Sequence, residues 1–271
     1  MTSQELKEVC RQARIDIINL TADAASGHPG GSLSAVELMT AVLYTQMRLF
    51  PDDPKNQDRD RFVLSKGHAA PCYYSLLCQL GFFDRSEMKN FRQLGGMLTG
   101  HPSVRTTPGV DVSTGSLGQG CSMAVGMAIA AKYLKKDTKV FTILGDGECQ
   151  EGQIWESFMS AAHYKLDNLT IIVDWNGLQI DGTNDEVMSL GDLHAKCAAF
   201  GLDVIELEDG NDLDAVIEAL SKPAAPGKPK CILAHTLKGK GVSYMEGQVG
   251  WHGKGPNEKE RAIALAELEE K

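Results

Sequence analysis

Four short, apolar and largely β-branched runs alternate with helical patterns in the second half of the sequence. The runs cover residues 139–144, 169–173, 202–207 and 230–235, and the helical patterns cover 119–135, 152–165, 191–200 and 212–221. Strands of this kind are buried on both faces, as in parallel sheets with helical connections. The pattern predicts an α/β fold: a doubly wound, mainly parallel sheet with helices on both faces. Such sheets place ligands at the carboxyl ends of their strands.

The first half is predicted to contain several helices and one short extended run, Phe62 to Leu64. An amphipathic helix is expected over the first 25 residues, ending at residues 26–31, which are too rich in glycine and proline to stay helical. A second helix follows, with Ser34 and Glu37 spaced as a capping box. Residues 94–116 and 236–256 lack periodicity, and long ordered loops inside a compact domain tend to be functional.

Composition excludes several classes of protein. Lys and Arg number 27 against 36 Asp and Glu, a net charge of −9, so neither nucleic acid nor an anionic membrane is an expected partner. No apolar run reaches the ~18 residues of a membrane span, and the first residues are not a signal peptide. Seven scattered cysteines without a CxxC pair favour free thiols and a cytoplasmic location. With no linker or repeat, we expect one domain over residues 1–271.

The sequence Gly-Asp-Gly-Glu at 145–148 directly follows a predicted strand and precedes a predicted helix. Glycines let backbone approach a ligand closely, and a helix N-terminus favours a phosphate. An aspartate among phosphates is explained by a divalent cation between them, and Asn176, at the end of the next strand, adds a second oxygen ligand. The carbonyl of Leu178 is a third candidate. Either motif alone could be an ordinary turn, but the pair at this spacing favours a metal-bridged diphosphate site.

These motifs resemble the thiamine-diphosphate motif, and much of the remaining chain resembles the amino-terminal part of transketolase. The matching segments, in order, are SGHPGG (26–31), DRFVLSKGHAAP (60–71), TGHP (99–102), TPGVDVSTGSLGQG (107–120), GDGE (145–148), DWNGLQIDG (174–182) and TLKGKGVSYMEGQVGWHGKGP (236–256). The resemblance covers nearly the whole chain. Ser116 departs from it, at a position where the family usually has proline.

The resemblance implies a role for each matching residue. Asp146, Asn176 and the Leu178 carbonyl would bind Mg²⁺ (or Ca²⁺ or Mn²⁺), which bridges the diphosphate of thiamine diphosphate. The other residues implied to bind the cofactor are Lys66, His68, Gly115, Leu117, Gly118, Gly145, Gly147, Glu148, Lys238 and His252. Among these, Gly115, Leu117 and Gly118 would lie near the two rings of the cofactor. Glu151 matches a family glutamate that is buried near a subunit contact.

Four histidines are implied to line the active-site channel and take part in catalysis: His28, His68, His101 and His252. All four follow or adjoin glycine in loops that should gather at one sheet edge. Sugar substrates need several hydrogen-bond donors and acceptors, and imidazole transfers protons near neutral pH. The remaining histidines, His163, His194 and His235, are interpreted as ordinary structural or surface residues.

In this family a glutamate of a second, pyrimidine-binding domain contacts the cofactor. The chain ends where that domain would begin, and we expect its last helix, 257–270, to be a natural end. The resemblance therefore implies one subunit of a split transketolase, which transfers a two-carbon ketol unit from a ketose phosphate to an aldose phosphate. The pyrimidine-binding domain would lie on a separate carboxy-terminal subunit, with two copies of each.

Two alternatives remain at this point: a related thiamine-diphosphate enzyme acting on another ketose or an oxo acid, and a cofactor-free scaffold that keeps the fold. The presence of Asp146 and Asn176 argues against a scaffold, which would need no metal ligands. A Rossmann dehydrogenase is disfavoured, because residues 115–120 read GxxGxG and follow no clear strand.

Overall fold

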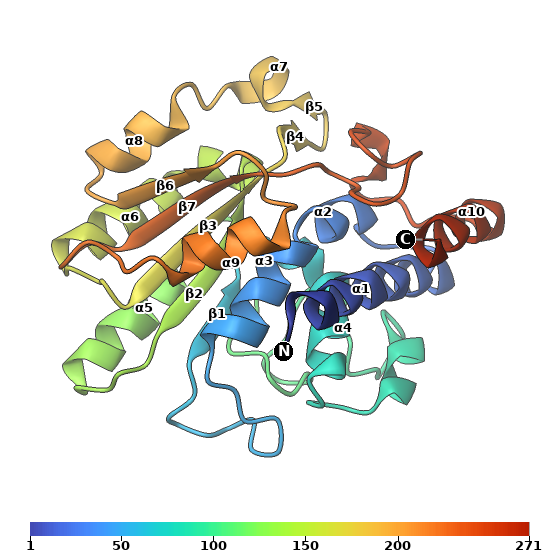
Figure 1. Cartoon of the computed structure of the whole chain (residues 1–271), viewed down its shortest axis with the longest axis horizontal. Coiled ribbons are helices and arrows are strands. Elements are labelled where there is room, and N and C mark those ends of the chain that lie inside the picture. Colours follow the sequence, from blue (N-terminus) through green and yellow to red (C-terminus); the bar gives the residue numbers. More distant parts are fainter. Residues whose placement is uncertain (271) are drawn as a thin grey trace.

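The computed structural model describes residues 1–270 and contains a five-stranded parallel sheet. In spatial order the strands are β1 (Arg61–Leu64), β2 (Val140–Gly145), β3 (Leu169–Trp175), β7 (Lys230–His235) and β6 (Asp203–Leu207). Each strand is parallel to its neighbours. The predicted α/β fold is confirmed, and its helices cover both faces of the sheet (Figure 1).

Alternate residues of each strand point to opposite faces, and each face has its own core. One core contains Phe141 and Ile143 of β2, and the other contains Val140 and Leu144. The first core is covered by α1 (Ser3–Asp23), α3 (Val36–Ala41), α4 (Ala70–Gln79), α9 (Leu213–Ser221) and α10 (Glu258–Glu269). The second core is covered by α5 (Gln119–Tyr133), α6 (Gly152–His163) and α8 (Leu193–Ala199). Burial on both faces explains why β2, β3 and β7 are largely apolar. The run 202–207 was predicted to be buried in the same way, but β6 lies at the edge of the sheet and is only partly buried.

Short elements gather at the carboxyl ends of the strands. They are α2 (Pro29–Ser34), α7 (Asn184–Met188) and a two-stranded hairpin of β4 (Leu178–Gln179) and β5 (Gly182–Thr183). In Figure 1, β4, β5 and α7 lie at the upper edge of the molecule. A π-helical turn follows α3 at Val42–Gln46, and 3₁₀ turns occupy Gly67–Ala69, Arg85–Asn90, Gly147–Gln150 and Val249–Trp251. The predicted loop 94–116 contains no helix or strand, and loop 236–256 contains only the last of these turns.

Two local predictions about the first half are wrong. Residues 29–31 are helical, because Pro29 begins α2 with a backbone angle suited to a first turn. The expected capping box is absent: Ala35 precedes α3, and no side chain caps that helix. Ser34 instead donates its hydroxyl to Asp174 (2.6 Å), and Glu37 pairs with Arg14. Tertiary partners, Asp174 at a strand end and Arg14 within α1, therefore replace the local ones.

All seven cysteines are free and buried, which agrees with the sequence interpretation. In residues 1–270, no helix combines the length and apolar character needed to cross a membrane.

Candidate cofactor and active site

The carboxyl ends of β2 and β3 meet in register, because Gly145 lies opposite Asp174. Asp146, which follows β2, is 2% exposed and joins the two strand ends. Its Oδ1 accepts from the Gly147 amide (2.8 Å), and its Oδ2 accepts from the Gly177 amide (2.5 Å). The predicted convergence of Asp146 and the Asn176 loop at one edge of the sheet is therefore observed.

Asp146 is an unusual buried carboxylate. Burial and the nearby Asp174 raise its pKa to about 6, against the opposing effect of the Gly147 and Gly177 amides and of Lys66. Within residues 1–270 no cation forms an ion pair with it. A buried carboxylate in this situation is stabilised by a cation that reaches it, so the residue fits the predicted metal ligand.

The two other predicted ligands lie on the same loop. The Asn176 Oδ1 accepts from the Leu178 amide (3.2 Å), and the Leu178 carbonyl accepts from the Lys238 ammonium (3.0 Å). A cationic group thus already contacts one of the predicted oxygen donors. One carboxylate, one amide and one carbonyl suit Mg²⁺ or Ca²⁺ completed by phosphate oxygens. No cluster of three or more His, Cys, Asp or Glu side chains able to hold a metal occurs in the described chain.

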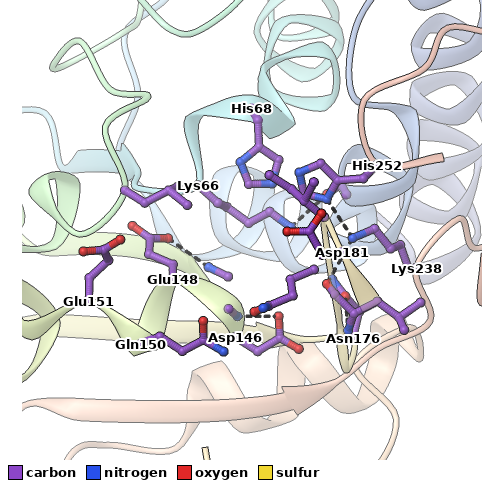
Figure 2. A pocket seen from close by; sticks show the side chains of 17 residues that line it. Lys66, His68, Asp146, Glu148, Gln150, Glu151, Asn176, Asp181, Lys238 and His252 are labelled. Atoms are coloured by element: carbon purple, nitrogen blue, oxygen red, sulfur yellow. Dashed lines mark hydrogen bonds between the residues drawn. The ribbon is translucent and has the colours of Figure 1, made fainter. Parts of the chain in front are cut away.

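A cavity of about 220 Å³ opens beside these loops (Figure 2). The predicted site residues that line it are Lys66, His68, Leu117, Gly145, Asp146, Gly147, Glu148, Glu151, Asn176, Leu178, Lys238 and His252. Gly31, Gln150, Gln179, Ile180 and Asp181 also line it and were not predicted. Three of these belong to the DWNGLQIDG segment, so the motif itself was a signal that could have found them.

The backbone of Gly147 lies against the side chain of Gln179. A Cβ on Gly147 would lie 2.9 Å from Gln179 Oε1, so the absence of a side chain keeps this part of the cavity open.

Glu148 holds the loop before α5 in place. Its carboxylate is 2% exposed and accepts from the Ser65 hydroxyl (2.5 Å) and from the Gly118 and Gly145 amides (2.8 and 3.0 Å). Burial raises the pKa of Glu148 despite these hydrogen bonds. Gly118, at φ +83°, adopts a conformation that favours glycine. Glu148 is therefore a link between the strand end and the GSLGQG loop.

Lys66 and Asp174 form a buried ion pair that sequence reasoning missed. Lys66 is 1% exposed, and Asp174 is fully buried. The Lys66 ammonium donates to Asp174 and to the Gly31 carbonyl (2.9 Å), while the hydroxyls of Ser34 and Thr236 also donate to Asp174. Asp174, at the end of β3, therefore links the ends of β1 and β7 and helix α2 through hydrogen bonds beneath the cavity.

The four predicted channel histidines form one cluster. The ring of His28 lies 5.3 Å from His68, 6.1 Å from His101 and 5.5 Å from His252, and His68 lies 5.2 Å from His252. His68 and His252 line the cavity, whereas His28 and His101 extend the cluster beyond it. A Cβ on Gly115 would lie 3.0 Å from the His101 ring, so this glycine permits the close approach of the loop. Gly115 and Gly118 do not line the cavity themselves.

Burial and nearby cations keep these imidazoles neutral. The pKa of His28 falls to about 4, through burial first and then the charges of Arg92, His101, Lys238 and Lys66. Burial and Lys238 lower the pKa of His252 to about 3. Burial also lowers the pKa of His68 and His101. At neutral pH each ring therefore offers one donor and one acceptor nitrogen.

We expect His28 to make stability sensitive to acid. Its pKa is about 4 in the folded chain and about 6.5 when unfolded, so the unfolded chain binds the proton first. The stability that neutral His28 contributes is present above pH 6.5 and is lost as the pH falls towards 4. Urea melts at several pH values would measure this. His28→Gln should flatten the decline, and identical pH profiles for both proteins would contradict the prediction.

The other histidines lie elsewhere. His194 and His235 both contact Glu206, at 2.9 and 2.8 Å, and His163 packs against Tyr164. None of the three lines the cavity, which agrees with the ordinary role assigned to them.

The sequence matches the family described as "Transketolase, thiamine diphosphate binding domain" over residues 3–268. The chain belongs to the transketolase family. Among solved structures, the transketolase of Campylobacter jejuni superimposes with a TM-score of 0.94 at 33% identity, covering 99% of this chain and 43% of that one. The chain thus spans about two fifths of the length of such transketolases.

Other transketolase relatives are nearly the same length as this chain. One of the subunits of the apulose-4-phosphate transketolase of Phocaeicola vulgatus is 42% identical, covering 100% of this chain and 96% of that protein. The 6-deoxy-6-sulfo-D-fructose transketolase subunit SqwG of a Clostridium species is 43% identical, covering 90% of this chain and 88% of that protein. Human transketolase, by contrast, is a longer relative: it is 42% identical, covering 93% of this chain and 40% of that protein.

Glu151 differs from the expectation drawn from other transketolases. It lines the cavity but is exposed in this single chain, whereas the family resemblance implied a buried glutamate. Its place at a contact between subunits stays a prediction.

Proposed function

We propose that this chain is the thiamine-diphosphate-binding subunit of a two-subunit transketolase, which transfers a two-carbon ketol unit from a ketose phosphate to an aldose phosphate. The observation that carries the proposal is the convergence of Asp146, Asn176 and the Leu178 carbonyl beside four clustered histidines. The relatives support it, because proteins of this length are named transketolase subunits.

We assign the site residues to two groups: those that would bind the metal ion and those that would contact the cofactor itself. Asp146, Asn176 and the Leu178 carbonyl would hold Mg²⁺, or Ca²⁺ or Mn²⁺ in its place, against the diphosphate. The remaining proposed contacts with thiamine diphosphate come from Lys66, His68, Gly115, Leu117, Gly118, Gly145, Gly147, Glu148, Lys238 and His252. When bound, the cofactor supplies an electron sink for carbon–carbon cleavage next to a carbonyl.

The protein would supply positioning and proton handling. Lys238, whose pKa burial and Lys66 lower to about 8, would neutralise phosphate charge that the acidic chain otherwise repels. The neutral rings of His28, His68, His101 and His252 would bind sugar hydroxyls and carry protons between them.

A separate carboxy-terminal subunit would carry the pyrimidine-binding domain and its glutamate. Support comes from relatives named as subunits, which this chain matches along nearly their entire length. By analogy we propose two copies of each subunit, with sugar phosphates as substrates. The relatives differ in the sugar they are named for, so a related reaction on another ketose is the second candidate, and a screen of ketose donors would separate the two.

The cofactor assignment can be tested by calorimetry on the full chain with thiamine diphosphate. We expect binding in the presence of Mg²⁺ and a large loss of affinity when EDTA removes it. Binding that is indifferent to the metal would contradict the bridging role, and the absence of any binding, with or without partner, would favour a cofactor-free scaffold.

We expect His28→Ala and His101→Ala to lower turnover of the reconstituted complex by about 10²–10⁴-fold each, because each removes a donor or proton carrier. His101 is exposed and His28 is only half-buried, so melting temperatures should change little. The exposed His163→Ala variant is the matched control and should keep normal turnover. A large fall in melting temperature with near-normal turnover would assign these histidines to structure.

A further inference from the structure

Asn184 carries a buried carboxamide whose polar atoms are both unpaired. The residue is 5% exposed, and its Oδ1 and Nδ2 are buried without a hydrogen-bond partner among residues 1–270. A buried polar group left unpaired destabilises a folded chain, and the large majority of such groups are paired in native proteins. Two unpaired atoms on one side chain therefore point to a contact that forms when a ligand is bound.

Backbone hydrogen bonds fix the position from which this carboxamide projects. Asn184 is the first residue of α7, whose start is held by reciprocal hydrogen bonds between Thr183 and Glu186. The Asn184 amide donates to the Gly177 carbonyl (3.0 Å), and the Gly177 amide donates to Asp146. A chain of hydrogen bonds therefore leads from Asn184 through the 176–178 loop to the proposed metal ligand.

The side chains of Asn184 and Gln179 border the same side of Gly147. A Cβ on Gly147 would lie 3.7 Å from Asn184 Oδ1 and 2.9 Å from Gln179 Oε1. Gln179 lines the cavity, whereas Asn184 does not. The Gln179 amide therefore faces the space proposed for the diphosphate, and the Asn184 amide lies in a layer behind it.

The amide of Gln179 can face the cavity as a donor or as an acceptor. A half turn about its last side-chain bond exchanges the amide oxygen and nitrogen, and only the NH₂ group can donate to a phosphate oxygen. A neighbouring carboxamide has both a donor and an acceptor side, so it can hold such a group in one orientation. Asn184 is the residue in place to do this.

We propose that Gln179 donates a hydrogen bond to the diphosphate of the cofactor, and that Asn184 is the positioning residue that holds the Gln179 amide in the donating orientation. The inference rests on the proposed function and adds two uncharged residues to the predicted set. The Asn184 carboxamide destabilises the chain without cofactor and gains its partner when the cofactor orients Gln179. Such a loss of stability in favour of binding is typical of functional sites.

The first test separates binding from stability with Asn184→Leu, which keeps the size of the side chain and removes both unpaired atoms. Without cofactor, the variant should melt at the wild-type temperature or above it. Its dissociation constant for thiamine diphosphate with Mg²⁺ should rise by about 3–10-fold, the effect of one lost hydrogen bond. Calorimetry on the full chain with its partner subunit measures this affinity.

Asn168→Leu is the matched control, because Asn168 precedes β3 at the opposite end of the sheet and also has a buried, unpaired amide oxygen. Its Nδ2 donates to the Ala128 and Thr138 carbonyls, so the control should lose stability and keep the wild-type affinity. Unchanged affinity in Asn184→Leu, whatever its melting temperature, would assign Asn184 to the fold and overturn the inference.

The second test asks whether Asn184 acts through Gln179. Gln179→Leu should lower the affinity by a similar factor, and the double variant should lose no more than Gln179→Leu alone, since residues that act through one another are not additive. The side-chain NH₂ NMR signals of both residues, identified by their absence from the variants, should move when thiamine diphosphate and Mg²⁺ are added. Losses that multiply in the double variant, or signals that stay unmoved, would overturn the positioning role. A wild-type complex that binds no thiamine diphosphate would instead refute the proposed function, so the two failures are distinguishable.

Discussion

Purified alone, the chain is expected to transfer no ketol units, and activity is expected to appear when a partner with a pyrimidine-binding domain is added. The proposed site fixes the diphosphate end of the cofactor through Asp146 and Asn176. The rings would remain open to water, and the proposed glutamate contact would be missing. Correct positioning and electrostatic stabilisation together account for large parts of enzymatic rate enhancement, so the gain on adding the partner should exceed about 10³-fold.

The measurement is formation of the transferred sugar from a ketose phosphate and an aldose phosphate, with the chain alone, the partner alone and the mixture. Mass spectrometry must exclude transketolase from the expression host. A mixture made with the Asp146→Ala chain is the matched control and should remain inactive. Activity from the pure chain without any partner would contradict the two-subunit proposal.

Asp146→Ala is expected to abolish Mg²⁺-dependent binding of thiamine diphosphate. The substitution removes the one buried carboxylate proposed to bind the metal ion. Without that ion, the negative charge of the diphosphate is repelled by the acidic protein. We expect at least a 10²-fold loss of affinity, about the upper range seen when a metal site loses a supporting group. Titration calorimetry with thiamine diphosphate and Mg²⁺ gives the affinity directly.

Two variants make this result specific. Asp181→Ala removes an exposed carboxylate that lines the same cavity, and it should bind nearly as well as the wild type. Asp146→Asn keeps the size of the side chain and one oxygen acceptor, but its NH₂ group cannot accept from the second of the Gly147 and Gly177 amides. It loses one of these hydrogen bonds and the negative charge, so it should bind more weakly than the wild type. Undiminished affinity in Asp146→Ala, with the fold intact by circular dichroism, would remove Asp146 from the metal site.

The positions of Asp146 and Asn176 could be predicted because the geometry of a parallel sheet determines which strand ends lie next to each other. Asp146 and Asn176 each follow an apolar strand, and parallel neighbours in register bring such residues to one edge. The gathering of His28, His101 and His252 there was implied by the family resemblance, because none of them directly follows a strand. The placement of Asp146 and Asn176 needs only the strand periodicity and the parallel order that alternating strands and helices predict.

The support beneath the site could not be predicted in this way. Lys66 and Asp174 are 108 positions apart, and Ser34 and Asp174 are 140 apart. Their contacts depend on how α2 packs over the strand ends, which no local pattern specifies. The spacing of Ser34 and Glu37 indicated a helix cap, yet both side chains found more distant partners.

The hydrogen bonds of Asp146 also have a kinetic consequence. They join the 145–148 turn to the 176–178 loop through protein groups alone, so part of the conformational entropy of ordering these loops is lost during folding. Rigid receptors lose less freedom on association than those that must close around a ligand. Loading of the cofactor should therefore be a simple docking event with single-exponential kinetics, and chain purified without cofactor should remain competent to take it up.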